Sequence, residues 1–125
     1  MDDSLVISFN KTIQSFSHAF RGLKVSLTEE QNLRIELLLG FISVLMGIYF
    51  HLSFIEWIVL FLTIALVIGS ELFNTALENI VDLASPEIHP LAKKAKDAAA
   101  AAVLISSIAA AIVGIFLFLP KILHW

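Results

Sequence analysis

The longest stretch of this sequence without a charged side chain begins at Ala98, and the 22 residues from Ala98 to Leu119 are enough to cross a bilayer as a helix. Two further apolar stretches precede it, at residues 37–52 and at residues 54–70, where Glu56 is the one charge. Backbone groups inside lipid must be hydrogen-bonded within the protein, which favours helices. We therefore predict an all-α integral membrane protein, one domain over residues 1–125, with transmembrane helices at 34–52, 55–83 and 98–119.

Composition supports lipid as the solvent of this chain. Hydrophobic residues make up 58% of the sequence, against roughly 45–50% in soluble domains. The net charge is −3 and there is no cysteine, so nucleic acid is not expected as a partner and thiolate chemistry is excluded. Neither a GxxxxGK[ST] nor a GxGxxG segment occurs, which argues against the nucleotide-binding folds of soluble proteins.

Residues 5–27 have the pattern of an amphipathic helix. Apolar side chains recur at spacings of three and four, with Lys11, Arg21 and Lys24 among the polar residues between them. A basic polar face opposite aromatic residues is typical of a helix lying on an anionic membrane surface, although a helix packed on a soluble core has the same period. Gly22 is a candidate bend, and Thr28, with Gln31 three residues later, predicts the start of the next helix.

The distribution of positive charge predicts the topology. Of the eight Lys and Arg residues, Lys121 alone follows the third predicted span, and the others precede the first span or lie in the predicted polar loop at residues 86–97. The positive-inside rule then places the N-terminus in the cytoplasm and the C-terminus outside. In the third span, small residues recur every fourth position from Ala98 to Gly114, which favours close packing in a bundle or an oligomer.

A polar stripe lies on the second predicted span. Glu71, Asn74, Glu78 and Asp82 fall within an arc of roughly 80° and climb on the order of 16 Å along the helix. Ionisable residues at membrane depth are costly and are candidates for function, while a structural polar seam between helices is the alternative reading.

Acids and lysines on the same predicted side suggest metal-dependent phosphate chemistry. Glu30 precedes the first span, and Lys93, Lys94, Lys96 and Asp97 precede the third. Magnesium binds through one or two carboxylates together with nucleotide phosphates, and lysine stabilises phosphate charge. Phosphoryl transfer needs these parts and a base for the attacking hydroxyl. The lysines by themselves are also explained as ordinary positive-inside residues.

The strings ELFNTALENIVD, TEEQNLRIE and HPLAKKAKDAAAAAVL resemble the small prokaryotic diacylglycerol kinase and undecaprenol kinase family over nearly the whole chain. The resemblance implies ATP and Mg²⁺, a homotrimer in the bacterial cell membrane, and specific residue roles. Glu71 would be the catalytic base with Asn74 beside it, and Glu30 and Glu78 would hold the magnesium. The ATP-binding residues would be Glu30, Glu78, Asp82, Glu87, His89, Lys96 and Asp97.

The substrate implied by the resemblance is a membrane lipid alcohol. The segments SFIEWIVLFL, HPLAKKAKDAAAAAV and FLPK are more similar to undecaprenol kinases of Gram-positive bacteria than to diacylglycerol kinases of Gram-negative ones. Undecaprenol is therefore the expected substrate and diacylglycerol the alternative. An ion or proton conductor is a more distant alternative, disfavoured because residues 59–69 offer only Thr63 as a polar side chain. A purely structural protein would not explain the clustered acids and lysines.

Overall fold

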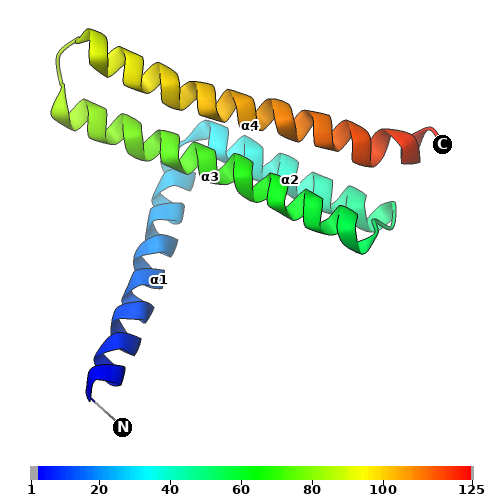
Figure 1. The fold of residues 1–125 in the computed structure, drawn as a ribbon, viewed down its shortest axis with the longest axis horizontal. Helices are drawn as coiled ribbons and strands as arrows, with labels where there is room; N and C mark the ends of the chain where they lie inside the picture. Colours follow the sequence, from blue (N-terminus) through cyan, green and yellow to red (C-terminus); the bar gives the residue numbers. More distant parts are fainter. Residues whose placement is uncertain (1–2, 125) are drawn as a thin grey trace.

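The computed structural model describes residues 3–124, of which residues 4–7 by their backbone alone, so Met1, Asp2 and Trp125 of the predicted domain lie outside it. Four helices follow one another: α1 (Asp3–Glu29), α2 (Gln31–Tyr49), α3 (Phe54–Ala84) and α4 (Pro90–Ile122). Helices α2, α3 and α4 run alongside one another, while α1 projects steeply away from them (Figure 1). The prediction of an all-helical chain with three helices fit to span a membrane is confirmed, since α2, α3 and α4 are long and apolar enough.

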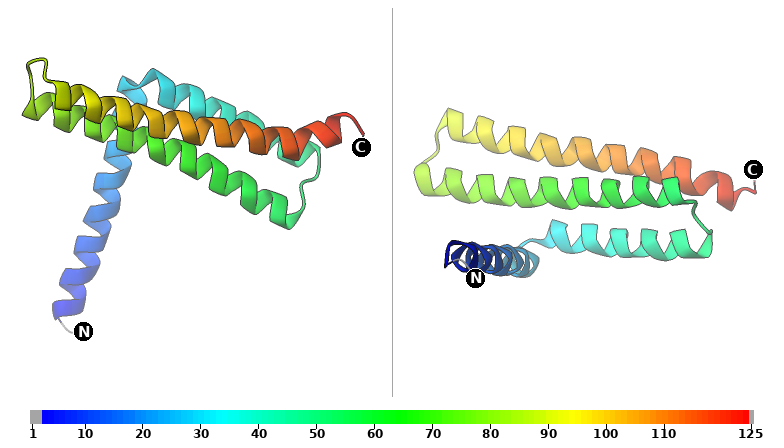
Figure 2. Two further views of the ribbon diagram at one scale, coloured as in Figure 1. Left: turned by 45° about the horizontal axis from the view of Figure 1, so that its top comes forward. Right: turned by 60° about the horizontal axis from the view of Figure 1, so that its bottom comes forward.

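Helix α3 packs against both α2 and α4 and lies between them in the right-hand view of Figure 2; we call these three helices the layer. The α3–α4 contact is the more extensive. Midway along it, the hydroxyl groups of Ser70 and buried Ser106 are hydrogen-bonded at 2.7 Å. A polar bridge of this kind satisfies both groups where no water is available, and it holds the two helices in register.

Large apolar side chains cover the outside of the layer. Phe41, Phe61, Ile105 and Phe116 are each more than half exposed, although they lie on three different helices. Exposed apolar surface on this scale is a liability in water and is solvated by hydrocarbon in a bilayer. The exposed face of the layer therefore agrees with a membrane environment.

The start of α2 differs from the prediction at Thr28. Helix α1 continues unbroken through Gly22 to Glu29, and Thr28 donates its hydroxyl to the Val25 carbonyl at 2.7 Å instead of capping α2. The guanidinium of Arg34 donates to the carbonyls of Leu27 and Thr28 at 2.9 and 3.0 Å. Because Arg34 satisfies carbonyls at the end of α1, that helix can run past the predicted boundary.

The hairpin between α2 and α3 is tightly packed. Ser53 caps α3 in a capping box with Glu56. The carboxylate of Glu56 also accepts a hydrogen bond from Lys121 near the end of α4, at 3.0 Å. This ion pair joins the hairpin to the end of α4, next to a core of Leu52, Leu60, Leu117 and Phe118.

Helix α4 is longer than the predicted third span at both ends. It begins at Pro90, so the loop predicted over residues 86–97 is too long. His89 explains the early start, because its Nδ1 accepts the amide of Leu91 at 3.1 Å and Pro90 occupies the first helical turn. At the other end the helix passes Pro120 and stops at Ile122, within one turn of the predicted break.

Candidate active site

Three polar residues of α3, a helix long and apolar enough to span a membrane, lie together. Glu71 is 2% exposed, and Asn74 donates its side-chain amide to Glu78 at 3.3 Å. All three line one cavity of about 440 Å³ between α2, α3 and α4, which we call the carboxylate cavity. The predicted stripe is therefore brought together over Glu71, Asn74 and Glu78, and Asp82 lies one turn beyond the cavity.

The sequence prediction missed Glu36, which lines the carboxylate cavity from α2. Its charge is close enough to that of Glu71 for the two carboxyl groups to interact electrostatically. A signal for this residue was present, because Glu36 is the last charged residue before the charge-free stretch at residues 37–52. What the sequence could not tell is which side of α2 would face α3.

The carboxylate cavity contains unpaired hydrogen-bonding atoms. Among the described residues, four buried side-chain atoms have no hydrogen-bond partner, and three of them belong to the cavity: Glu36 Oε2, Glu71 Oε2 and Asn74 Oδ1. Buried polar atoms are almost always paired, so an unpaired group needs an explanation. A bound hydroxyl or a cation would satisfy these acceptors. The cavity is therefore built to receive a polar group.

Glu30 stands at the junction of α1 and α2, in the N-cap position of α2. It is not among the residues lining the carboxylate cavity, but its charge, like that of Glu78, acts on Glu71. Within residues 3–124 no three His, Asp or Glu side chains form a metal-ligating cluster. Magnesium needs fewer protein ligands, since one or two carboxylates and nucleotide phosphates hold it. Within the carboxylate cavity, Glu78 and the unpaired oxygens of Glu36 and Glu71 are ligands of the kind that magnesium takes, whereas Glu30 lies outside the cavity lining.

The remaining predicted ATP-binding residues surround a second hollow. It measures about 280 Å³, lies where the α3–α4 loop joins the two helices, and is lined by Asp82, Glu87, His89, Lys93, Lys96 and Asp97 among others. We call it the loop hollow. Lys96 forms an ion pair with Asp82 across the two helices, and Lys93 pairs with Asp97 at 2.6 Å. These pairs are largely exposed and worth little in stability, so a polyphosphate could displace them at low cost.

The two cavities are neighbours along α3. Glu78 lines the carboxylate cavity and Asp82, one turn later, lines the loop hollow. Lys96 is within electrostatic range of both residues. The arrangement thus places an acidic cavity next to a hollow that carries lysines, and acids beside lysines are parts that phosphate transfer to a hydroxyl group requires.

Comparison with known proteins agrees with this chemistry. A family model described as prokaryotic diacylglycerol kinase matches residues 17–118. The chain is 41% identical to an undecaprenol kinase of Bacillus subtilis over 90% of this chain and 92% of that protein. It is 44% identical to a diacylglycerol kinase of Synechocystis over 87% of this chain and 63% of that protein. It is 31% identical to a diacylglycerol kinase of Escherichia coli over 83% of this chain and 85% of that protein. The chain is a member of the prokaryotic diacylglycerol kinase family, and is thus a lipid kinase.

Proposed function

We propose that this chain transfers the γ-phosphoryl group of ATP to the hydroxyl of undecaprenol, giving undecaprenyl phosphate and ADP. The observation that carries the proposal is Glu71, a buried carboxylate on an apolar helix, with an unpaired oxygen in a cavity large enough for an alcohol group. The relative from Bacillus subtilis, named as an undecaprenol kinase and matched over 92% of its length, supports this choice of alcohol.

In the proposed reaction, Glu71 acts as the general base. It takes the proton from the lipid hydroxyl as the oxygen attacks the γ-phosphorus, and the bond to the β-phosphate oxygen breaks in line with the attack. Asn74 orients groups next to Glu71, and its hydrogen bond to Glu78 holds it in place. Burial supports this role, because a base that is shielded from water keeps its proton transfer directed to the substrate.

The nucleotide is proposed to lie over the loop hollow, with its phosphates toward the carboxylate cavity. Glu30 and Glu78 would hold the Mg²⁺ that accompanies ATP, and that ion would neutralise charge on the phosphates. Lys96 exchanges its ion pair with Asp82 for a phosphate contact. Glu87, His89 and Asp97 line the rim of the same hollow and are proposed to contact the nucleotide.

The membrane placement is part of the proposal. Helix α1 projects away from the three-helix layer and carries exposed aromatic residues, of which Phe16 is 62% and Phe20 69% exposed. A helix with this surface suits the interface of a bacterial cell membrane, on the cytoplasmic side where the basic residues gather. The C-terminus would then be outside. The unclosed layer of three helices and the exposed small residues Ala98 and Ala102 of α4 support assembly into a homotrimer.

The direct test is magnesium-dependent transfer of labelled phosphate from ATP by the purified protein in mixed micelles. Undecaprenol and diacylglycerol are offered in parallel, at equal mole fractions. Preference for undecaprenol supports the proposal. Preference for diacylglycerol keeps the mechanism and changes the substrate. No transfer to either alcohol overturns both the mechanism and the substrate, provided that the helical content and a cooperative thermal unfolding transition show the protein to be folded.

Diacylglycerol is the second candidate substrate, because relatives from Synechocystis and Escherichia coli carry that name. A conductor of ions or protons is a distant alternative. It requires a polar path across the layer, but the described part of α3 between Leu60 and Ile68 is apolar apart from Thr63. Ion flux through vesicles containing the protein would be the measurement in its favour.

A further inference from the structure

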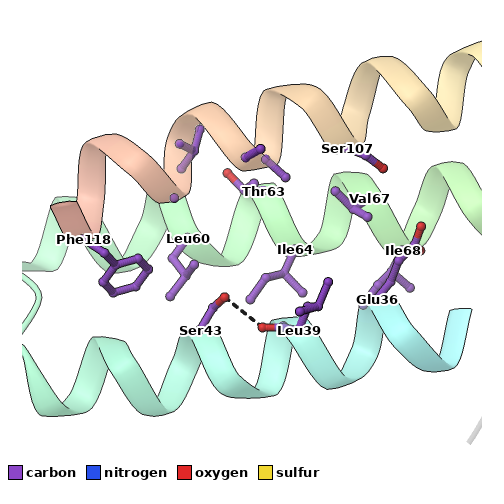
Figure 3. A pocket seen from close by; sticks show the side chains of 15 residues that line it. Glu36, Leu39, Ser43, Leu60, Thr63, Ile64, Val67, Ile68, Ser107 and Phe118 are labelled. Atoms are coloured by element: carbon purple, nitrogen blue, oxygen red, sulfur yellow. Dashed lines mark hydrogen bonds between the residues drawn. The ribbon is translucent and has the colours of Figure 1, made fainter. Parts of the chain in front are cut away.

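A third cavity follows the side of α3 that lies between α2 and α4. It measures about 340 Å³, and we call it the apolar groove. Figure 3 shows Phe118 at one end of the groove and Glu36 with Ser107 at the other. Glu36 and Ser107 also line the carboxylate cavity. The apolar groove therefore opens directly onto the cavity that holds Glu71.

The walls of the groove favour hydrocarbon. Most of the lining is aliphatic or glycine. The hydroxyls of Ser43 and Thr63 are satisfied within their own helices, because they donate to the carbonyls of Leu39 and Val59 at 2.8 and 2.7 Å. Hydroxyl groups that already donate within their own helices do not need a hydrogen-bond acceptor on a ligand. Away from its mouth, the groove thus offers packing surface and little hydrogen bonding.

The groove is large enough for the first part of a single hydrocarbon chain. From Ser107 to Phe118, α4 rises about 16 Å at about 1.5 Å per residue, roughly half of the bilayer's hydrocarbon core of about 30 Å. The far end is closed by buried Leu60, Leu117 and Phe118. The volume is near the lower limit of about 300 Å³ for small-molecule sites. A long chain would place its first units in the groove and continue into the lipid.

Gly114 lines the groove on the α4 side. A Cβ added at Gly114 would meet no atom within 4 Å, so this side of the wall is open. On the α2 side, a Cβ added at Gly40 would lie 3.3 Å from Ile64. The helices are therefore close together at Gly40, while free space remains at Gly114. That space is available to methyl branches on a chain.

We infer that the apolar groove holds the polyprenyl chain of the substrate next to its hydroxyl, and that Gly114 makes the room for the branched chain. The inference rests on the proposed function and specifies its substrate class. One groove takes a single chain, which can leave toward the lipid on the open side at Gly114, whereas diacylglycerol brings two chains on adjacent carbons. The groove thus selects a polyprenol by shape, in addition to the chemistry at Glu71.

The test compares Gly114→Leu with the wild type and with Gly69→Leu. Gly69 is a matched control, because a Cβ there also meets nothing within 4 Å and Gly69 is not among the groove residues. Each protein is assayed with undecaprenol and with 3-methyl-2-buten-1-ol, which is too short to reach Gly114. Gly114→Leu should raise the KM for undecaprenol about tenfold or more and leave the short alcohol unaffected. Gly69→Leu should change neither. The milder Gly114→Ala should have an intermediate effect.

A second measurement is independent of turnover. A prenyl alcohol carrying a diazirine on its third isoprene unit is photolysed with the wild-type protein, and labelled peptides are identified by mass spectrometry. Labels between Ser107 and Phe118 that disappear in Gly114→Leu support the inference, whether or not the alcohol is phosphorylated. Labelling there without any phosphorylation would overturn only the proposed function. Labels confined to other surfaces overturn the inference. Equal loss of activity of Gly114→Leu with both alcohols also overturns the inference. A changed oligomer size of Gly114→Leu with unchanged substrate selectivity overturns it as well, and would assign the groove to a second copy of the chain.

Discussion

Glu36 of α2 and Glu71 of α3 line the same cavity, and each has a buried carboxylate oxygen without a hydrogen-bond partner among the described residues. Two carboxyl groups this close repel one another when both are charged, so the arrangement is costly unless a cation or a donor lies between them. A lipid hydroxyl beside a magnesium-bound phosphate supplies such groups. The pairing gives specific expectations for variants of each residue.

Replacing the proposed base should remove most of the activity. Glu71→Gln keeps the shape of the side chain but cannot take a proton, so turnover should fall by about 10²–10⁴-fold. The measurement is the rate of phosphate transfer at saturating ATP and lipid. Glu29→Gln is the matched control, because Glu29 is exposed at the end of α1 and lies outside both cavities. Activity of Glu71→Gln within a few-fold of wild type would remove Glu71 from the role of base.

Glu36 should matter for a different reason. It stands at the mouth of the apolar groove, so we expect its carboxyl group to donate a hydrogen bond to the oxygen of the lipid hydroxyl, which leaves the hydroxyl proton directed at Glu71. Loss of such a hydrogen bond costs about 0.5–1.5 kcal/mol, so Glu36→Ala should lower kcat/KM for the lipid by about two- to tenfold. The KM for ATP should stay the same. An equal change in the KM for ATP would assign Glu36 to the nucleotide instead.

The magnesium assignment has its own titration. With Glu30→Gln or Glu78→Gln, the magnesium concentration that gives half-maximal activity should rise by about tenfold or more. Loss of a residue that only orients a metal ligand already weakens metal binding by about tenfold or more, and loss of the ligand itself should cost at least as much. The titration is run at fixed free ATP, with Glu87→Gln as a comparison on the rim of the loop hollow. If both variants keep the wild-type magnesium dependence, the ion is held by other groups.

The close packing around Gly47, near the hairpin between α2 and α3, predicts that a larger residue at this position lowers the stability of the fold. A Cβ at Gly47 would lie 2.7 Å from the Trp57 ring and 3.0 Å from the Leu52 side chain. Gly47→Ala should therefore cost about 1–3 kcal/mol through overpacking, seen as a lower thermal midpoint in detergent. Gly69→Ala is the control in open space, where the change should be neutral or stabilising by up to about 1 kcal/mol. An unchanged midpoint for Gly47→Ala would mean that Trp57 moves aside freely.

Much of the architecture follows from the sequence. Charge-free stretches of membrane length, such as residues 98–119, specify spanning helices because lipid leaves the backbone no other way to satisfy its polar groups. The spacing of Glu71, Asn74 and Glu78 is also a local property, since a helix of known period puts them on one face. Local rules failed at helix ends. The Thr28 boundary and the loop before Ala98 were both misjudged, because Arg34 and His89 provide caps that the pattern does not reveal.

Only the tertiary structure decided which faces meet. The period of α2 puts Glu30 and Glu36 on different sides of a helix, and the packing of α2 against α3 is what brings Glu36 to Glu71. Packing also decides that Gly114 of α4 faces free space while Gly47 of α2 is pressed against Trp57. A sequence determines the residues on each helix face through a fixed local geometry. The rotation and separation of helices depend on many weak contacts between distant residues, which no local pattern records.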